Sequence, residues 1–440
     1  MSETQEQSKS LIEELMESWT HLSEDERVSQ FRKLAQEDAE DLLLALPSRE
    51  QAILFEEFSR SERRLWIRFM PPDDVTDLIQ ELPEEMKGDL LSMVDETSRR
   101  EIIALLSYKE DEAGGLMSPR FVRVRPHMLV AEAIRYVRQQ AQAVDQIHYV
   151  YVLDSEQKLL GVLSIRQLFV SPAEKRVDQI MESELVTIPE EMDQESVSRL
   201  FTQHRYVALP VVDDTRRMRG VVTVDDILDV SQEEATEDIH KLGGTEALDA
   251  PYPQVPLLEM LKKRAGWLML LFVGEMFTTT AMHHFEGQIA QAVVLALFIP
   301  LIISSGGNSG SQATTLIIRA LSLQHLRLSD WKRVFVREAI SGLLLGLILA
   351  GIGLLRILAW PNRESLYTEH YLMVAATVCI SLVGVVLFGS LTGSMLPFIL
   401  RRLGLDPASA SAPLVATLVD VTGLVIYFQL AHLLLKGTLL

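Results

Sequence analysis

The chain has 440 residues, too many for one hydrophobic core, and its charge is divided unevenly along its length. Of the 41 Lys and Arg and the 61 Asp and Glu, residues 257–440 hold 13 and 9, which leaves 28 and 52 in residues 1–256. A front half with a net charge of −24 (28 minus 52) repels nucleic acid and attracts cations, so we expect no nucleic-acid partner. The single cysteine, Cys379, excludes an intrachain disulfide.

The front half begins with a polar, acidic segment, residues 1–10, that lacks the features of a signal peptide, so we expect this half in the cytoplasm. From residue 10 to residue 110, apolar side chains recur three or four positions apart, which predicts helices throughout. Pro47, Pro71 and Pro83 divide the pattern, each followed by acidic residues that suit the first turn of a helix. Short helix pairs about two dozen residues apart predict a superhelix of repeats.

Residues 115–230 contain a unit that occurs twice. Asp154 and Gly161 in the first copy have the same spacing as Asp213 and Gly220 in the second, across an Asp-rich turn. The residue pattern of each copy predicts a β-α-β-β-α order. The two copies must stack to bury the faces of both sheets. The expected strands lie at 121–124, 149–153 and 160–163 and at 185–188, 208–212 and 220–222, with helices at 130–140 and 194–203.

This pair resembles tandem CBS modules, in which a cleft between the copies often takes an adenine nucleotide. The resemblance implies that Ser or Thr and Asp of each closing segment hold phosphate and ribose. Thr223 and Asp226 fit that pattern in the second copy, whereas in the first copy Gln167 replaces the acid. The positions that would contact a nucleotide such as ATP are Ser164, Arg166, Tyr206 and Thr223.

Residues 231–256 are acidic and are then broken by Gly243, Gly244 and three prolines, which predicts a linker between soluble and membrane parts. The linker leads into an expected amphipathic helix at 257–264. Five spans long enough to cross a bilayer follow, at about 265–284, 288–320, 336–359, 371–400 and 410–435. Ten Lys and Arg lie on the side of the N-terminus and three on the other side, which predicts an N-terminus inside and a C-terminus outside.

Residues 300–312, with the sequence PLIISSGGNSGSQ, break the second span with small and polar residues, and Asp420 is an acid inside the fifth. Glycines, an amide and a carboxylate are costly in a bilayer unless they line water or pair inside protein. One interpretation is a cation pathway lined by Gly306, Gly307 and Asn308, with the Ala416 carbonyl sharing a helix face with Asp420. Oxygen ligands suit Mg²⁺. The alternative is that the glycines only allow close helix packing and that Asp420 hydrogen-bonds a neighbouring helix.

These segments together resemble the MgtE family of magnesium channels and transporters. The motifs that carry the resemblance are 111–117 (DEAGGLM), 234–242 (EATEDIHKL), 306–312 (GGNSGSQ) and 416–423 (ATLVDVTG), which occur in this order. The resemblance implies a homodimer with the ion path on its two-fold axis, and ion binding at Ala416 and Asp420. It also implies a cytoplasmic sensor in which Mg²⁺ bridges carboxylates and closes the pore. The matching positions are Asp73, Asp77, Asp193, Glu195, Asp226, Asp229, Glu234, Glu237 and Asp238.

For any one of these acids, ordinary helix-start chemistry is an equally good explanation. Glu275, in the first span, faces either the path or a neighbouring helix. His283 and His284, beside Glu286, lie at the outer mouth as a divalent-binding vestibule or as solvated interfacial residues. No catalytic constellation is visible, so we expect no enzyme.

The expected fold class is a mostly α, multidomain chain. Its expected parts are a helical superhelix (1–114), tandem α+β CBS domains (115–231), a linker or plug helix (232–264) and a five-helix transmembrane domain (265–440). The expected function is Mg²⁺ import across the plasma (bacterial inner) membrane, closed by cytoplasmic Mg²⁺ that binds the acidic domains, with ATP as a candidate regulatory ligand. Two other functions stay open: transport of another divalent ion such as Co²⁺, and a nucleotide-responsive membrane scaffold without an ion path.

Overall fold

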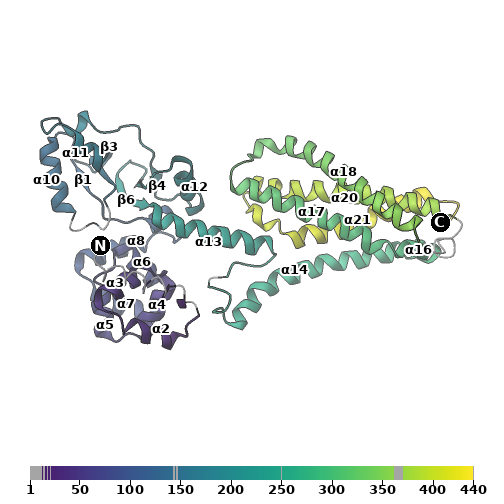
Figure 1. Cartoon of the computed structure of the whole chain (residues 1–440), viewed down its shortest axis with the longest axis horizontal. Coiled ribbons are helices and arrows are strands. Elements are labelled where there is room, and N and C mark those ends of the chain that lie inside the picture. The colour runs from purple at the N-terminus through teal and green to yellow at the C-terminus, as the bar shows by residue number, and fades with distance from the viewer. Residues whose placement is uncertain are drawn as a thin grey trace. The chain divides into compact units, whose positions relative to one another are not determined.

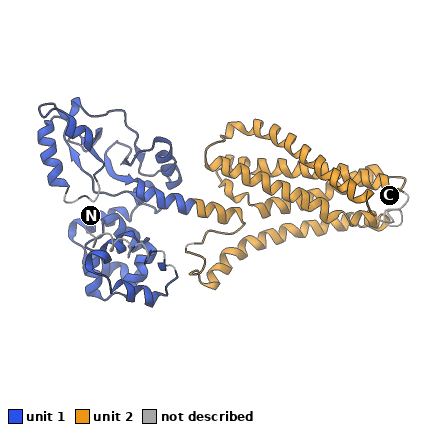
Figure 2. Ribbon diagram, in the orientation of Figure 1, with its two compact units in different colours: residues 1–234 blue, residues 235–440 orange. Residues whose placement is uncertain are grey.

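The computed structural model describes residues 21–141, 147–248, 250–360 and 370–439, with Ile12, Leu15, Met16, Ser18, Trp19 and Val144. The chain forms two compact units, residues 1–234 and 235–440 (Figure 2). Helices make up most of both units, and among the described residues strands occur only from residue 123 to residue 223, in the first unit (Figure 1). The expected fold class is therefore confirmed.

The first unit starts with short helices that begin every 12 residues, from residue 24 to residue 96. Helices 24 residues apart pack together, because α2 contacts α4, α4 contacts α6, and α6 contacts α8. Pro47, Pro71 and Pro83 each occupy the N-cap position directly before a helix, as expected. The bounds are α2 (Glu24–Phe31), α3 (Gln36–Ala45), α4 (Ser48–Glu57), α5 (Arg60–Trp66), α6 (Pro72–Glu81), α7 (Glu84–Met93) and α8 (Glu96–Leu105).

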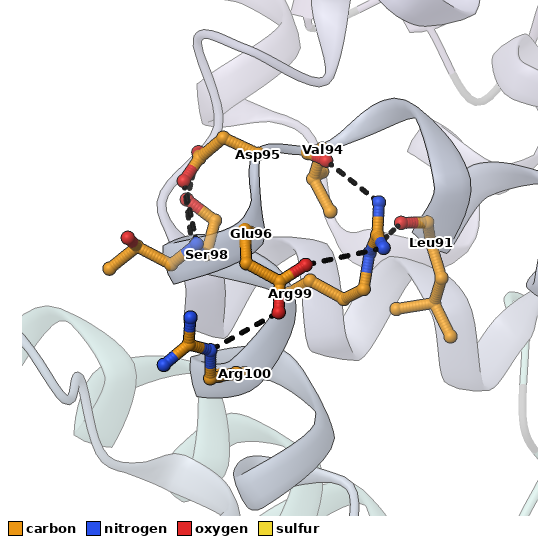
Figure 3. A network of polar contacts seen from close by, with 8 residues as sticks. Leu91, Val94, Asp95, Glu96, Ser98, Arg99 and Arg100 are labelled. Atoms are coloured by element: carbon orange, nitrogen blue, oxygen red, sulfur yellow. Dashed lines mark hydrogen bonds and ion pairs between the residues drawn. The ribbon is translucent and has the colours of Figure 1, made fainter.

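Three arginines reveal a longer repeat of 36 residues that the sequence analysis missed. Each stands four positions after the N-cap of its helix, and its Nε donates to a carbonyl eight residues earlier, in the preceding helical segment. The guanidinium therefore ties the start of one helix to the end of the one before it; Figure 3 shows the third case. The pairs are Arg27 with Trp19 (3.0 Å), Arg63 with Phe55 (2.7 Å) and Arg99 with Leu91 (2.9 Å).

The two CBS copies form two sheets with the same pairing. In each sheet the first strand runs parallel to the second, and the third runs antiparallel to it. The predicted strand at 208–212 and the helix at 130–140 have the expected bounds. The elements are α9 (Ala113–Leu116), β1 (Arg123–Val124), α10 (Val130–Gln140), β2 (Tyr149–Leu153), β3 (Leu159–Ser164), α11 (Ile165–Val170), η1 (Val177–Gln179), β4 (Ile188–Pro189), α12 (Gln194–His204), β5 (Ala208–Val212) and β6 (Met218–Thr223).

The copies join through their Asp-rich turns. The Leu159 amide donates to the Arg216 carbonyl, and the Met218 amide donates to the Gln157 carbonyl, at 3.0 Å each. Residues from both copies share one apolar cluster, which includes Tyr151, Leu153, Leu159, Ala208 and Val212. The expected stacking of the two copies is therefore present. The long helix α13 (Val224–Leu242) follows β6 without a break.

The second unit contains five helical segments long and apolar enough to cross a membrane, counted over the described residues. They are Leu257–His284, Val293–Ser322, Leu328–Leu358, Tyr371–Arg402 and Ala412–Leu435. The fourth lies at the centre, since it packs against the second, third and fifth (Figure 1). The elements are α14 (Leu257–His284), α15 (Glu286–Gln291), α16 (Val293–Ala296), α17 (Ile299–Ser322), η2 (Leu328–Asp330), α18 (Trp331–Leu358), α20 (Tyr371–Arg402), η3 (Pro407–Ser409) and α21 (Ala412–Leu435).

Two expectations about this unit are wrong. Residues 257–264 are helical, but they do not form a helix of their own, because α14 runs without interruption from Leu257 to His284. The glycine-rich stretch does not break the second span either, since α17 is continuous from Ile299 to Ser322. Glycine costs a helix only about 1 kcal/mol relative to alanine, and tertiary packing offsets that cost here.

The packing in question is a close approach of α17 to α20. A Cβ added to Gly389 would lie 2.2 Å from the Gly306 carbonyl oxygen, and one added to Gly393 would lie 2.1 Å from that of Gly310. The approach is reinforced by a hydrogen bond from Thr314 Oγ1 to the Gly393 carbonyl, 2.8 Å long. Close packing, the alternative reading of the glycine-rich stretch, thus accounts for Gly306 and Gly310.

Candidate ion pathway and regulatory sites

Asp420 lies beside the one glycine of the motif that α20 does not cover. A Cβ added to Gly307 would lie 3.6 Å from Ala416 Cα and 3.9 Å from Asp420 Oδ1. Gly307 therefore turns its bare backbone towards the face of α21 that carries Ala416 and Asp420. Asp420 is half-buried, so its carboxylate keeps access to space outside the bundle of this unit.

A polar stripe continues along α17 on its uncovered side. Ser304, Asn308, Gln312 and Thr315 are exposed and lie on one helical face, three or four residues apart. Ser311 lies beside them and donates to the Ala412 carbonyl of α21 at 3.2 Å. Of the three predicted pore-lining residues, Gly307 thus faces Asp420, Asn308 lies on the stripe, and Gly306 faces α20. The stripe borders an open cavity of about 450 Å³, lined by Ser311, Gln312, Thr315 and Leu316.

Glu275 brings a second carboxylate to this place. It is exposed on α14, and its charge acts on Asp420. The neighbouring Gly274 allows α14 to approach α21 closely, because a Cβ there would lie 2.8 Å from Thr417 Cγ2. Of the two alternatives for Glu275, the structure thus favours the face near Asp420.

The backbone around Asp420 is a continuous helix. Pro413 is at the start of α21, so it initiates the helix and frees no carbonyl inside it. Ala416 is within the same continuous helix, and its carbonyl is therefore engaged with the residue four positions on. A carbonyl oxygen has two lone pairs, so the Ala416 carbonyl can still offer one of them to a cation while it accepts the helix hydrogen bond.

In the first unit, three predicted sensor acids come together: Asp73 and Asp77 from α6 and Asp226 from α13. Burial and then repulsion from Asp73 raise the pKa of Asp77 to about 8. Burial raises the pKa of Asp226 to about 7, against a 2.7 Å hydrogen bond from Thr223 and with added repulsion from Asp73. The group is thus partly protonated at neutral pH, and a bound cation would favour its charged form.

The other sensor acids are dispersed among separate contacts. Asp193 caps α12 by accepting from the Ser196 amide, and Glu195 pairs with Arg199 at 2.8 Å. Glu234 accepts from Gln194 at 2.8 Å, while Asp229 is exposed. In the second unit, Glu237 pairs with Lys241, and Asp238 accepts from Ser322 at 3.0 Å. Within the described part of the chain, no three acidic, His or Cys side chains converge closely enough to hold a metal directly.

The predicted nucleotide positions have a common local geometry in the two copies. Ser164 caps α11 and shares hydrogen bonds with Gln167, as Thr223 does with Asp226. Gln167 also donates to Glu182 at 2.8 Å, an interaction that an acid in its place would lose. Arg166 is exposed, and Tyr206 is partly exposed and stacks on His204.

The outer histidines show an ordinary surface contact. His283 and Glu286 are both exposed, and His283 Nδ1 lies 3.2 Å from a Glu286 oxygen. His284 packs edge-on against Phe285.

Comparison with known proteins covers nearly the whole chain. Residues 299–430 match the family model of MgtE, described as a divalent cation transporter, residues 11–111 match the MgtE intracellular N domain, and residues 113–173 and 177–233 match CBS domains. The magnesium transporter MgtE of Thermus thermophilus is 40% identical over 428 residues, 97% of this chain and 93% of the relative. The chain belongs to the MgtE family.

The chain is also similar to two further proteins. The magnesium transporter MgtE of Bacillus subtilis is 29% identical over 93% of this chain and 89% of its own length. A solved structure, the cytosolic domain of the Mg²⁺ channel MgtE in complex with ATP, is 36% identical and covers 50% of this chain and 90% of that one, with a TM-score of 0.47.

Proposed function

We propose that this MgtE protein conducts Mg²⁺ across the plasma (bacterial inner) membrane along the polar face of α17. The observation that carries the proposal is the position of Asp420 beside the bare backbone of Gly307, at one edge of the stripe through Asn308. A carboxylate and hydroxyl, amide and carbonyl oxygens match the ligands that Mg²⁺ prefers. Mg²⁺ sheds water reluctantly, so we expect it to pass with part of its hydration shell.

The membrane unit of one chain does not cover this path. Only 6% of the apolar 18-residue stretch of α14 is buried, and the polar stripe on α17 is exposed. Polar groups cannot face lipid at the bilayer centre without a large cost. A second copy of the chain would cover the stripe, and we therefore propose a homodimer with the path between the copies. In our proposal the N-terminal domains are in the cytoplasm and the C-terminus is outside.

We further propose that cytoplasmic Mg²⁺ closes the path. The acids Asp73, Asp77 and Asp226 would bind the ion through its waters, since Mg²⁺ is often held by only one or two carboxylates. Helix α13 is suited to transmit the change, because it begins at Val224 in the second CBS copy and ends at Leu242. Near that end, Lys241 pairs with Asp406 at 2.7 Å and Asp238 accepts from Ser322, the last residue of α17. ATP, bound near Thr223 and Tyr206, is proposed as a regulatory ligand.

The deciding experiment is ion flux in liposomes that contain the full-length protein. We expect Mg²⁺ entry that falls as Mg²⁺ on the cytoplasmic side of the protein rises, and weaker competition from Co²⁺ and Ni²⁺. Flux of Co²⁺ without Mg²⁺ would favour a transporter of another divalent ion. Absence of any ion flux, with nucleotide binding intact, would favour a membrane scaffold.

Removing the charge of Asp77 should make the stability of the first unit less dependent on pH and on Mg²⁺. The pKa of Asp77 in the folded chain, about 8, is above the ordinary 3.8 of an aspartate, so the folded chain keeps a proton that the unfolded chain loses. The stability that this proton contributes is complete below pH 3.8 and is lost as pH rises through about 8. Asp77→Asn should therefore raise the melting temperature at pH 8.5 without Mg²⁺ by several degrees, because about 1 kcal/mol moves the midpoint by roughly 2–4 °C at this size.

The matching measurements are melting curves at pH 5 and pH 8.5, with and without Mg²⁺. At pH 5 the variant and the parent should agree, since the parent is protonated there. Mg²⁺ should stabilise the parent more than the variant at pH 8.5. Asp41→Asn, which removes an exposed acid on α3, is the control and should change neither comparison. Equal pH dependence in parent and Asp77→Asn would contradict the sensor proposal.

A further inference from the structure

A rim of cations surrounds one end of the membrane unit. The ends of α17 and α20 and the start of α18 meet there in an apolar cluster that contains Ile317, Leu321, Val334 and Phe398. Basic side chains occur around this cluster on α18, on the loop that precedes it and at the end of α20. We call the following residues the basic rim: Arg327, Lys332, Arg333, Arg337, Arg401 and Arg402.

Most cations of the basic rim are not neutralised by an ion pair. All of its side chains are exposed except Arg401, which is partly exposed. Over the described residues, none of the six forms an ion pair, whereas many arginines of the first unit do. Four acids lie at this end. Asp330 accepts from the Arg327 amide at 2.8 Å, and Glu338 is partly buried next to Arg337. Asp238 accepts from Ser322 at the end of α17, and Asp406, which pairs with Lys241, follows Arg402 by four residues. Six cations against these four acids leave a net positive surface.

Large apolar side chains alternate with these cations and are also exposed. Leu323, Leu328, Trp331 and Phe335 are 46%, 41%, 45% and 42% exposed. On α18, Trp331 and Phe335 share one helical side and Arg333 and Arg337 share the other, with the buried Val334 between them. A surface of this composition suits a boundary where hydrocarbon meets charge.

The position of Trp331 fits the headgroup level of a bilayer. Helix α18 has 28 residues and is therefore about 42 Å long, close to the thickness of a bilayer with its headgroups. At its other end, Arg356 stacks on Trp360 at 3.7 Å. Tryptophan and cationic side chains at both ends are typical of interfacial anchoring. The two ends differ in charge, because only the Trp331 end carries the cluster of six.

We propose that the basic rim binds the headgroups of anionic phospholipids. The guanidinium groups of Arg333 and Arg337 and the Lys332 ammonium would contact headgroup phosphates, while Trp331 and Phe335 enter the region below them. A nucleic acid would also meet positive charge here, but it would leave the exposed apolar side chains in water and would be repelled by the acidic front half. An anionic lipid satisfies both the charges and the apolar groups.

The experiment is native mass spectrometry of the full-length protein, delipidated in detergent and titrated with phosphatidylglycerol or phosphatidylcholine of the same chains. The parent should retain phosphatidylglycerol preferentially. Removing three cations, in the triple variant Lys332→Gln, Arg333→Gln and Arg337→Gln, should weaken phosphatidylglycerol binding by about 100-fold, at roughly 1 kcal/mol per cation. Phosphatidylcholine binding should be unchanged.

Two further variants keep the test decisive. A triple change of Arg68, Arg135 and Arg138 to Gln removes the same charge from exposed sites of the first unit and should retain phosphatidylglycerol as the parent does. Lys332→Arg with Arg333→Lys and Arg337→Lys keeps the charge and should retain most of the binding. Equal retention of the two lipids by the parent, or full retention by the Gln variant, would overturn the proposal. Displacement of the lipid by millimolar inorganic phosphate would instead assign the rim to soluble phosphate and would also overturn it.

Discussion

Asp420→Asn should abolish Mg²⁺ flux while leaving the fold intact. The side chain is half-buried in α21 next to Gly307, so an amide of the same size fits where the carboxylate lies. Asn keeps an oxygen ligand but loses the charge that offsets the removal of water from Mg²⁺. Losing a group that merely supports a metal ligand reduces affinity or activity by about 10–100-fold, and the loss of a direct ligand should cost at least as much.

The measurement is Mg²⁺ entry into liposomes, with oligomeric state and melting temperature recorded for the same preparation. Glu338→Gln is the matched control, because Glu338 is another partly buried acid of the long apolar helices. It should leave flux within a few fold of the parent, since no residue of the polar stripe is on its helix. If Asp420→Asn transports at the parental rate, the path does not pass Asp420. If both variants lose flux equally, any acid in this unit matters and the assignment to one site is wrong.

Glu275 adds a second negative charge near Asp420. Its charge acts on Asp420, so part of the negative field at the site comes from α14. A single carboxylate would attract one divalent ion weakly, whereas two compensate its charge more fully. We infer that the field of both acids, rather than a closed cage of ligands, concentrates Mg²⁺ at this point.

The sequence predicted the parts of this arrangement that depend on local patterns. Strand β5 and helix α10 have their expected bounds because alternation and helical periodicity are local signals. The continuity of α17 was missed, because a glycine's effect on a helix depends on what packs against it. The hydrophobic context of Gly306 is visible in the sequence, but the backbone of Gly389 is 83 residues away.

The close-packing interpretation of the glycines had a signal in the sequence. Glycines spaced four apart occur at Gly306 and Gly310, at Gly342 and Gly346, and at Gly389 and Gly393. This spacing places both glycines on one helical face and allows another backbone to approach. Similarly, the 36-residue spacing of Arg27, Arg63 and Arg99 is visible in the sequence once the helices are aligned by their N-caps. The proximity of Asp77 to Asp226 had no local signal, since it depends on how the helical domain meets the second CBS copy within the first unit.

Gly393→Ala should prevent the membrane unit from folding. The added methyl group would lie 2.1 Å from the Gly310 carbonyl oxygen and 2.8 Å from Thr314 Oγ1. The nearer neighbour is backbone, which cannot move aside without shifting α17, and the hydrogen bond from Thr314 to the Gly393 carbonyl would be strained as well. Overpacking costs typically 1–3 kcal/mol where side chains adjust, and we expect more than about 3 kcal/mol against backbone. Such a loss is a large fraction of the stability of an ordinary domain.

The control is Gly384→Ala on the same helix. A Cβ there would lie 3.6 Å from its nearest neighbour, Ile426 Cγ2, at ordinary contact distance. Because alanine favours a helix over glycine by about 1 kcal/mol, Gly384→Ala should fold as well as the parent or slightly better. The measurement is the fraction of monodisperse protein after detergent extraction, with melting temperature for what is recovered. Parental yield and stability for Gly393→Ala would mean that α17 and α20 do not approach as closely as described. In that case the position of Gly307 beside Asp420, which depends on the same helix, would lose its support.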